Sequence, residues 1–177
     1  KQVNPFTGTK VWTVPGRGAR PLGKPAEQTR ELADHDRRAA CVFCPDNYLS
    51  TPPEKTRLVK RAGGLVRGHD LIRCVPADRL DATVPEFRRV PNLFEILSWR
   101  YWQLNWGMSL PRAARDWQEE YLSNPSGEAH VRSVLNAKFK AVGSDRRAED
   151  LGPQELREAS AAFFAGGHDV IVARRHY

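Results

Sequence analysis

Residues 41–54, CVFCPDNYLSTPPE, are the stretch around which the rest of the sequence is organised. Cys41 and Cys44 are two residues apart, so a turn can direct both sulfur atoms at one small volume, which suits a metal, a disulfide or a redox pair. Zinc takes thiolate and imidazole ligands in tetrahedral sets, and such a turn supplies half of one set. His176 is the best candidate for a further ligand. We favour a metal over a free redox pair because Pro45 and His176 fit a metal site better.

Composition predicts one globular domain with an anionic partner. The chain has 177 residues, of which 40% are hydrophobic and 28% charged, with a formal net charge of +7. That excess of basic residues suits nucleic acid, a nucleotide or a sugar phosphate, although a basic, solvated surface explains it equally well. Three cysteines are too few for a disulfide scaffold and indicate a reducing compartment, which we expect to be the cytoplasm. No apolar run approaches the roughly 20 residues that span a bilayer, and no membrane association is expected.

The strand signals lie on either side of a long helical stretch. Strands are expected near residues 10–14, 71–75, 87–91 and 169–174, and residues 60–70 are expected to form a glycine-rich basic loop. Cys74 is expected to be a small buried hydrophobe. These strands predict an antiparallel sheet with helices on one face, in the α+β class, with one edge left open at the carboxyl end.

The helical stretch runs from about residue 99 to residue 165. One apolar stripe is expected to begin at Ser126 and to stop at Gly143, and it contains Val131, Val134, Leu135, Phe139 and Val142. Pro153 is expected to open another helix. Trp99, Trp102 and Trp106 share one helical face, where core packing is favoured over a base-stacking platform. His130 is expected to face solvent.

Arg17 and Arg20 lie on a loop at residues 15–21 that prolines stiffen and glycines open. Arginine side chains match the geometry of phosphate oxygens, and glycine allows an anion to approach the backbone. From the loop alone, a solvated basic turn is the favoured interpretation, with phosphate binding as the alternative.

Several stretches together resemble the galactose-1-phosphate uridylyltransferases, which belong to the histidine-triad superfamily. The matching segments, in order, are residues 4–8, 12–21, 41–47, 51–54, 89–94 and 167–172, followed by His176. No single segment decides the match, but their order makes it fairly specific. The resemblance covers about residues 4–58, 86–97 and 166–177, and the helical stretch at about 99–165 would be an insertion into a histidine-triad-like domain that spans residues 1–177.

The resemblance implies a role for eight residues. The zinc ligands would be Cys41, Cys44 and His176. The substrate phosphate would be reached by Arg17 and Arg20, in some members of the family across a dimer interface. The segment that lines the uridine nucleotide pocket would be Asn92, Leu93 and Phe94.

The family's reaction has two steps. A histidine attacks the α-phosphorus of UDP-glucose and releases glucose 1-phosphate, and galactose 1-phosphate then attacks the uridylyl-histidine to give UDP-galactose. Zinc would have a structural role. The nucleophile belongs to a His-Pro-His motif that this sequence lacks, and we expect it downstream of Tyr177. The chain would therefore be the amino-terminal portion of the enzyme, inactive alone, acting as a homodimer or with a complementary carboxyl-terminal chain.

Two other classes of function remain open. A histidine-triad adenylyltransferase or dinucleoside polyphosphate phosphorylase would keep the fold and change the substrate. A zinc-knuckle module could instead bind nucleic acid through its basic charge and tryptophans. The nucleic-acid hypothesis is the less favoured, because the basic residues are scattered along the sequence.

Overall fold

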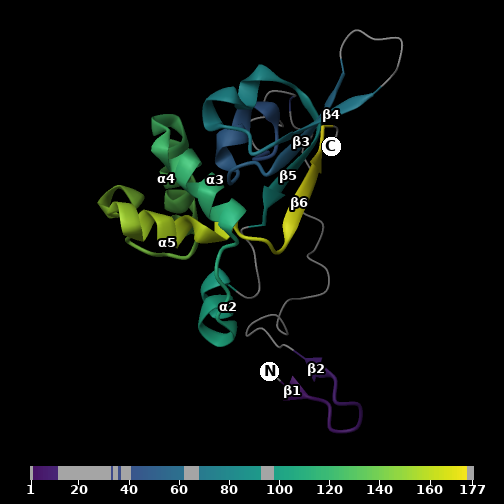
Figure 1. Cartoon of the computed structure of the whole chain (residues 1–177), viewed down its shortest axis with the longest axis vertical. Helices are drawn as coiled ribbons and strands as arrows, with labels where there is room; N and C mark the ends of the chain where they lie inside the picture. The colour runs from purple at the N-terminus through teal and green to yellow at the C-terminus, as the bar shows by residue number, and fades with distance from the viewer. Residues whose placement is uncertain are drawn as a thin grey trace. The chain divides into compact units, whose positions relative to one another are not determined.

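The structure, a computed structural model, describes residues 2–11, 33, 36, 41–61, 68–92 and 98–174. The chain divides into two compact units, Lys1–Ala33 and Asp34–Tyr177, which are described separately below. Figure 1 shows the course of the chain within each unit.

The described part of the first unit is a hairpin. β1 (Gln2–Val3) pairs antiparallel with β2 (Lys10–Val11). The side chain of Asn4 accepts hydrogen bonds from the backbone N–H groups of Phe6 (2.9 Å) and Thr7 (3.2 Å). Gly8 has φ +68°, which a glycine adopts without the steric penalty of a Cβ atom.

The second unit is built on a four-stranded antiparallel sheet in the order β4-β3-β5-β6. Its strands are β3 (Thr56–Lys60), β4 (His69–Arg73), β5 (Pro85–Pro91) and β6 (Asp169–Ala173). The predicted α+β class and the predicted open antiparallel sheet are confirmed. β4 and β6 are its edges.

The strand predictions need three corrections. β3 was not predicted, because Arg57 occupies its inward position and hides the usual alternation of apolar and polar residues. Residues 10 and 11 belong to the hairpin rather than to this sheet. β4 ends at Arg73, and Cys74, expected to be buried, is exposed with φ +52°. This left-handed conformation turns the chain out of the sheet.

Four helices occupy the segment predicted to be a helical insertion: α2 (Trp99–Trp106), α3 (Arg112–Ser123), α4 (Pro125–Ala141) and α5 (Pro153–Phe164). The described residues of the unit also form three short 3₁₀ turns: η1 (Pro45–Ser50), η2 (Ala77–Ala82) and η3 (Ala148–Asp150). None of the helices in the described part of the chain is long and apolar enough to cross a membrane.

Capping residues fix the bounds of these helices. The N-cap of α4 is Asn124, whose Oδ1 accepts from Ser126 N at 2.9 Å, so the prediction of Ser126 as the cap was wrong by two residues. Pro153 occupies the first turn of α5, as predicted. Gly143, at φ +67°, follows the end of α4, as predicted, but Val142 is 71% exposed because it lies beyond the last helical turn.

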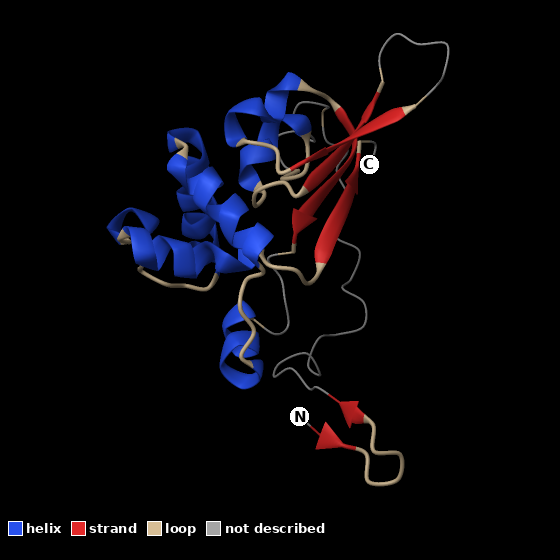
Figure 2. Cartoon of the chain, viewed as in Figure 1, coloured by secondary structure: helices blue, strands red, loops and turns tan. Residues whose placement is uncertain are grey.

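The helices pack on one face of the sheet (Figure 2). Arg57, Arg88 and Val172 lie side by side in the register of β3, β5 and β6, and all three are buried on this face. On the opposite face, Phe87 and Ile171 are exposed. Of the three tryptophans expected in the core, Trp99 is buried with Ala161 and Ala165, whereas Trp106, the last residue of α2, is 64% exposed.

Candidate functional site

Cys41 and Cys44 flank a turn that internal hydrogen bonds close. Cys44 N donates to Cys41 O at 3.1 Å, Asn47 N donates to Cys44 O at 2.9 Å, and Asn47 Nδ2 donates to Cys41 O at 2.9 Å. Pro45 opens η1 directly after Cys44. Cys44 is fully buried and Cys41 is half-buried. The turn thus carries two thiols, which fits half of a structural zinc site, although the described residues contain no group of three metal-binding side chains.

The end of β6 lies beside this turn. A cavity of about 20 Å³ is lined by Phe43 and Pro45 from the turn and by Ala173 and Arg174 from the end of the strand. His176 lies outside the described residues. The structure therefore brings the cysteine turn close to the segment that leads to the third predicted ligand.

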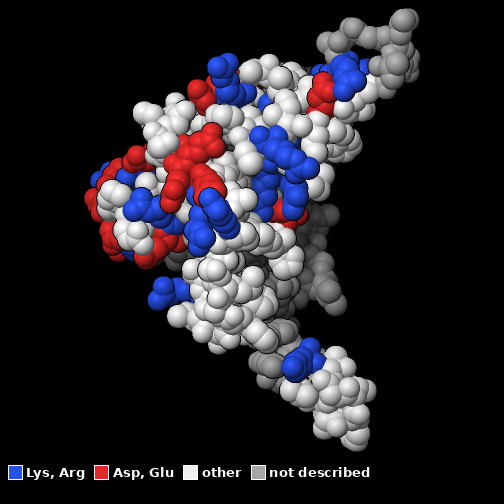
Figure 3. All heavy atoms as spheres, in the orientation of Figure 1, with Lys and Arg blue, Asp and Glu red and all other residues white. Residues whose placement is uncertain are grey.

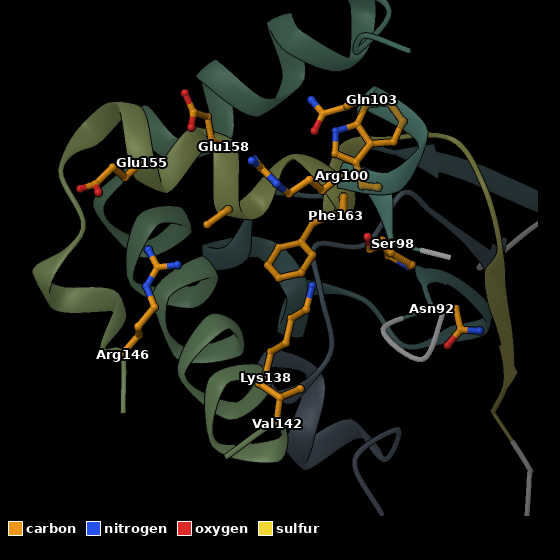
Figure 4. Close-up of a pocket in the computed structure, with 14 residues that line it drawn as sticks. Asn92, Ser98, Arg100, Gln103, Lys138, Val142, Arg146, Glu155, Glu158 and Phe163 are labelled. Atoms are coloured by element: carbon orange, nitrogen blue, oxygen red, sulfur yellow. The ribbon is translucent and has the colours of Figure 1, made fainter. Parts of the chain in front are cut away.

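Asn92 lies at the other end of the same pair of strands. Its backbone N–H donates to His168 O at 3.0 Å, which ties the end of β5 to the start of β6. Asn92 lines a pocket of about 670 Å³ between the sheet and helices α2, α4 and α5 (Figure 4). This volume is within the range of about 300–1,000 Å³ that small-molecule sites have.

Three basic side chains line the pocket: Arg100 from α2, Lys138 from α4, and Arg146 from the loop after α4. Figure 4 shows Lys138 reaching toward the Phe163 ring, and its Nζ lies 6.0 Å from the ring centroid. Within the described residues these three cations form no ion pair. They are therefore available to a ligand with negative charge.

Two carboxylates also line this pocket, and both have partners. Glu155 Oε2 accepts from Gly152 N at 3.0 Å, and Glu158 Oε1 accepts from Gln154 Nε2 at 2.8 Å. The pocket wall therefore has three cations and two carboxylates, and the carboxylates can also accept hydrogen bonds from ligand hydroxyl groups.

An apolar pocket of about 390 Å³ adjoins the basic one. Trp99 and Ala162 line both pockets, and the second is completed by Trp102, Met108, Ala165, Gly166, Gly167 and His168. Aromatic side chains at a pocket wall can stack on a planar ring. A ligand with both a planar apolar part and an anionic part would match the two pockets together.

The two halves of the predicted site lie at opposite ends of the sheet. Asn92 follows Pro91, which pairs with Asp169 at the start of β6. The cysteine turn lies beside Ala173, at the end of β6. Four residues of antiparallel strand separate the two by about 14 Å. The cysteine turn therefore lies outside the Asn92 pocket.

Sequence reasoning missed a charged cluster that lies between the cysteine turn and the sheet. Glu54, Arg57 and Arg88 are at most 3% exposed. Arg57 binds both carboxylate oxygens of Glu54, with Nε–Oε1 at 2.6 Å and Nη2–Oε2 at 3.1 Å, and Arg88 Nε donates to Oε2 at 2.6 Å. In the sequence, the only indication of this cluster is Glu54, which stands at the end of residues 41–54.

His130 was expected to face solvent, but it is 3% exposed and joins α4 to the chain beyond η1. Its Nε2 lies 2.8 Å from Thr51 O, a carbonyl that can only accept, so Nε2 carries the proton and Nδ1 accepts from the Tyr121 hydroxyl at 2.7 Å. Burial lowers the pKa of His130 below its ordinary value, with a smaller contribution from the positive charge of Arg88. This residue has a structural role.

The remaining predicted site residues, Arg17, Arg20, Leu93, Phe94 and His176, lie outside the described residues. Arg100, Lys138 and Arg146 were not predicted to line a pocket, because helical periodicity places them only as polar positions on the surface of their segments.

Comparison with known proteins assigns a family. A family model described as a domain of unknown function (DUF4921) matches residues 1–177, and the chain belongs to this family. No curated protein and no solved structure matches the chain.

Proposed function

We propose that this DUF4921 chain forms the nucleotide-binding part of a hexose-1-phosphate uridylyltransferase with a histidine-triad-like sheet. The observation that carries the proposal is the pair of adjoining pockets at Asn92 and His168, one basic and one aromatic. A nucleotide diphosphate sugar has the matching parts: a planar base, a diphosphate and a sugar rich in hydroxyl groups.

Each part of this ligand has a partner in the two pockets. Arg100, Lys138 and Arg146 bind the phosphoryl oxygens and offset the charge that develops on them, and the aromatic pocket at Trp99 and Trp102 holds the uracil base. A histidine attacks the α-phosphorus of UDP-glucose, glucose 1-phosphate leaves, and galactose 1-phosphate then takes the uridylyl group to form UDP-galactose. The attacking imidazole comes from a His-Pro-His segment that this sequence does not contain, supplied by a further part of the enzyme or by a complementary chain.

Zinc has a structural role in this proposal. Cys41, Cys44 and His176 would hold the ion, which would then cross-link the cysteine turn to the segment that follows β6. This use of zinc matches the distance between the cysteine turn and the Asn92 pocket, and the burial of Cys44. Metal analysis of the purified protein should find one zinc per chain, and Cys41→Ser together with Cys44→Ser should abolish it. Zinc-free wild-type protein with a Cys41–Cys44 disulfide would instead indicate a redox pair.

Binding of UDP-glucose to the purified chain tests the nucleotide proposal. Lys138→Met should weaken UDP-glucose binding by roughly 10- to 100-fold, because a charge-assisted hydrogen bond to phosphate contributes about 1.5–3 kcal/mol. Arg112→Met is the matched control, because Arg112 is an exposed residue of α3 that does not line the pocket. Isothermal titration calorimetry measures both effects.

Four outcomes would count against the proposal. The uridylyltransferase would be wrong if UDP-glucose failed to bind, or if Lys138→Met and Arg112→Met bound it equally. Preferential binding of adenine nucleotides would favour the adenylyltransferase or phosphorylase alternative. Binding of nucleic acid with steep salt dependence would favour the zinc-knuckle alternative, although Figure 3 shows basic and acidic side chains interspersed over the described helices rather than gathered by sign.

A further inference from the structure

Residues 165–168, which connect α5 to β6, form part of the wall of the apolar pocket. The other residues that line this pocket are Trp99, Trp102, Met108 and Ala162. Gly166 and Gly167 are exposed, and Gly167 has φ +145°, a conformation that favours glycine. Because the backbone of glycine has more conformational freedom than that of any other residue, this part of the wall needs to be held in place by other segments.

Lys55 holds both ends of this connection. Its Nζ donates to Ala165 O at 2.6 Å and to Asp169 Oδ1 at 2.6 Å. Ala165 is the C-cap of α5 and Asp169 is the first residue of β6, so a single ammonium group bridges the two ends. The side chains of Lys55 and Asp169 are 12% and 7% exposed, and an ion pair with so little contact with water is only weakly screened by salt.

The end of β5 supplies two further contacts to the connection. Arg89 Nε donates to the second carboxylate oxygen of Asp169, Oδ2, at 2.7 Å, and Asn92 N donates to His168 O at 3.0 Å. Lys55 is itself tied to Arg89, because its backbone N–H donates to Arg89 O at 2.9 Å. Lys55 lines neither the apolar pocket nor the basic one, so it acts on a ligand through the residues that it holds.

We propose that Lys55 is a positioning residue for the apolar pocket: by bridging the two ends of residues 165–168 with one ammonium group, it fixes their backbone at the pocket wall. A wall that is already ordered lowers the entropy cost of binding a planar ring. That this ring is a nucleotide base rests on the proposed function. Residues 165–168 do not line the basic pocket, so Lys55 affects binding of the base and not of the phosphates.

Backbone amide order parameters from NMR relaxation test this role of Lys55 without any ligand. In the wild-type chain, residues 166–167 should have order parameters of about 0.85, typical of rigid backbone, and Lys55→Met should lower them below about 0.6. Lys55→Met leaves Asp169 paired with Arg89, so no buried charge loses its counter-charge and the variant should fold. The amides of residues 131–135 in α4 should keep their order parameters, which excludes a general loosening of the fold.

Two further variants complete this test. Arg132→Met is the matched control, because the Arg132 guanidinium also donates to a backbone carbonyl, that of Ala148, but on the connection between α4 and α5, and it should leave residues 166–167 unchanged. Asp169→Asn replaces the ion pair with a neutral hydrogen bond, so it should lower the order parameters of residues 166–167 by less than Lys55→Met. Unchanged order parameters in Lys55→Met overturn the proposal, and, if that variant does not fold, so do unchanged values in Asp169→Asn.

Titration calorimetry with UDP-glucose and with inorganic pyrophosphate tests the effect on binding. Lys55→Met should weaken UDP-glucose binding by roughly tenfold, because contacts to the base are lost, and should leave pyrophosphate binding unchanged, whereas Lys138→Met should weaken both. Lys55→Arg should restore UDP-glucose binding, because a guanidinium can also donate to two acceptors. Equal weakening of both ligands by Lys55→Met would overturn the proposal. If the wild-type chain does not bind UDP-glucose, the proposed function is wrong, and the order parameters still decide the role of Lys55.

Discussion

Two interiors hold the second unit together, and they are stabilised by different forces. The helical interior joins α3, α4 and α5 through side chains that are at most 9% exposed: Trp117, Tyr121, Val131, Val134, Leu135, Leu156, Phe163 and Phe164. The interior between the cysteine turn and the sheet contains Glu54, Arg57 and Arg88 at the same degree of burial. The first is apolar, whereas the second combines these charges with the apolar cluster of Tyr48, Val75 and Leu80.

This comparison shows that position in the fold, rather than residue type, decides which side chains are buried in the second unit. Apolar packing is non-directional and tolerates adjustment, whereas buried charges require partners at defined distances. His130 connects the two interiors, because one of its ring nitrogens bonds to Tyr121 in the helical interior and the other to Thr51 beside the charged cluster. The following substitutions address each interior and the link between them.

The charged interior should be the more sensitive to a single substitution. Glu54→Gln removes the carboxylate that both arginines share, and we expect a loss of about 3–5 kcal/mol in the free energy of unfolding, because two buried cations then lack a counter-charge. Urea denaturation measures the loss. The matched control is Asp116→Asn, whose ion pair with Arg112 is exposed and 3.7 Å long and should contribute less than about 1 kcal/mol.

Combining Glu54→Gln with Arg88→Met tests whether the loss is electrostatic. The double variant removes one cation together with the anion, so its destabilisation should be smaller than the sum of the two single effects. Additive losses would show that Glu54 acts through packing and would remove the contrast between the two interiors.

The helical interior should respond to loss of volume instead. Leu135→Ala deletes a side chain that is 1% exposed, and we expect a loss of about 2–5 kcal/mol from transfer and cavity effects. Leu135→Met, which nearly conserves volume, should lose less than about 1.5 kcal/mol. Urea denaturation distinguishes the two, and equal losses would indicate that the helical interior depends on shape rather than on the volume it buries.

His130, which links the two interiors, should make the free energy of unfolding depend on pH. Because burial lowers the pKa of His130 in the folded chain, the unfolded chain takes up a proton first as the pH falls. The contribution of His130 is therefore fully present above its ordinary pKa of about 6.5 and is lost as the pH falls below that value. One such proton changes the free energy of unfolding by at most about 1.4 kcal/mol per pH unit.

His130→Gln should flatten this slope between pH 7 and 5. Unfolding curves of both proteins at matched ionic strength make the comparison, and the wild-type chain should show the steeper loss. Parallel pH profiles would mean that other groups, rather than His130, set the acid sensitivity of the wild type.

The sequence predicted regular elements where one physical signal dominated. The apolar stripe of Val131, Val134 and Leu135 placed α4, and Pro153 placed the start of α5. β5 and β6 were predicted to within two residues at each end. The prediction failed where two signals competed: β3 carries a buried arginine on its inward side, and Cys74 leaves the strand in a left-handed conformation.

For the candidate site, the sequence identified residues but not their arrangement. Cys41, Cys44 and Asn92 were named from spacing and resemblance, and the structure places them at two ends of one strand pair. Arg100, Lys138 and Arg146 reach the Asn92 pocket from different segments. A basic residue on a helix surface has the same local pattern whether it faces solvent or a pocket, so sequence periodicity could not single them out.

By itself the sequence determined the α+β class, the position of its most periodic helix and the turn that carries Cys41 and Cys44, because hydrophobic period, proline and cysteine spacing act over a few residues. Only the tertiary structure decided that Glu54, Arg57 and Arg88 are buried together, that His130 links two interiors, and that two pockets adjoin at Asn92 and His168. The physical reason is that burial and charge pairing depend on neighbours far apart in the chain, such as Arg57 and Arg88, which meet only when their strands pair.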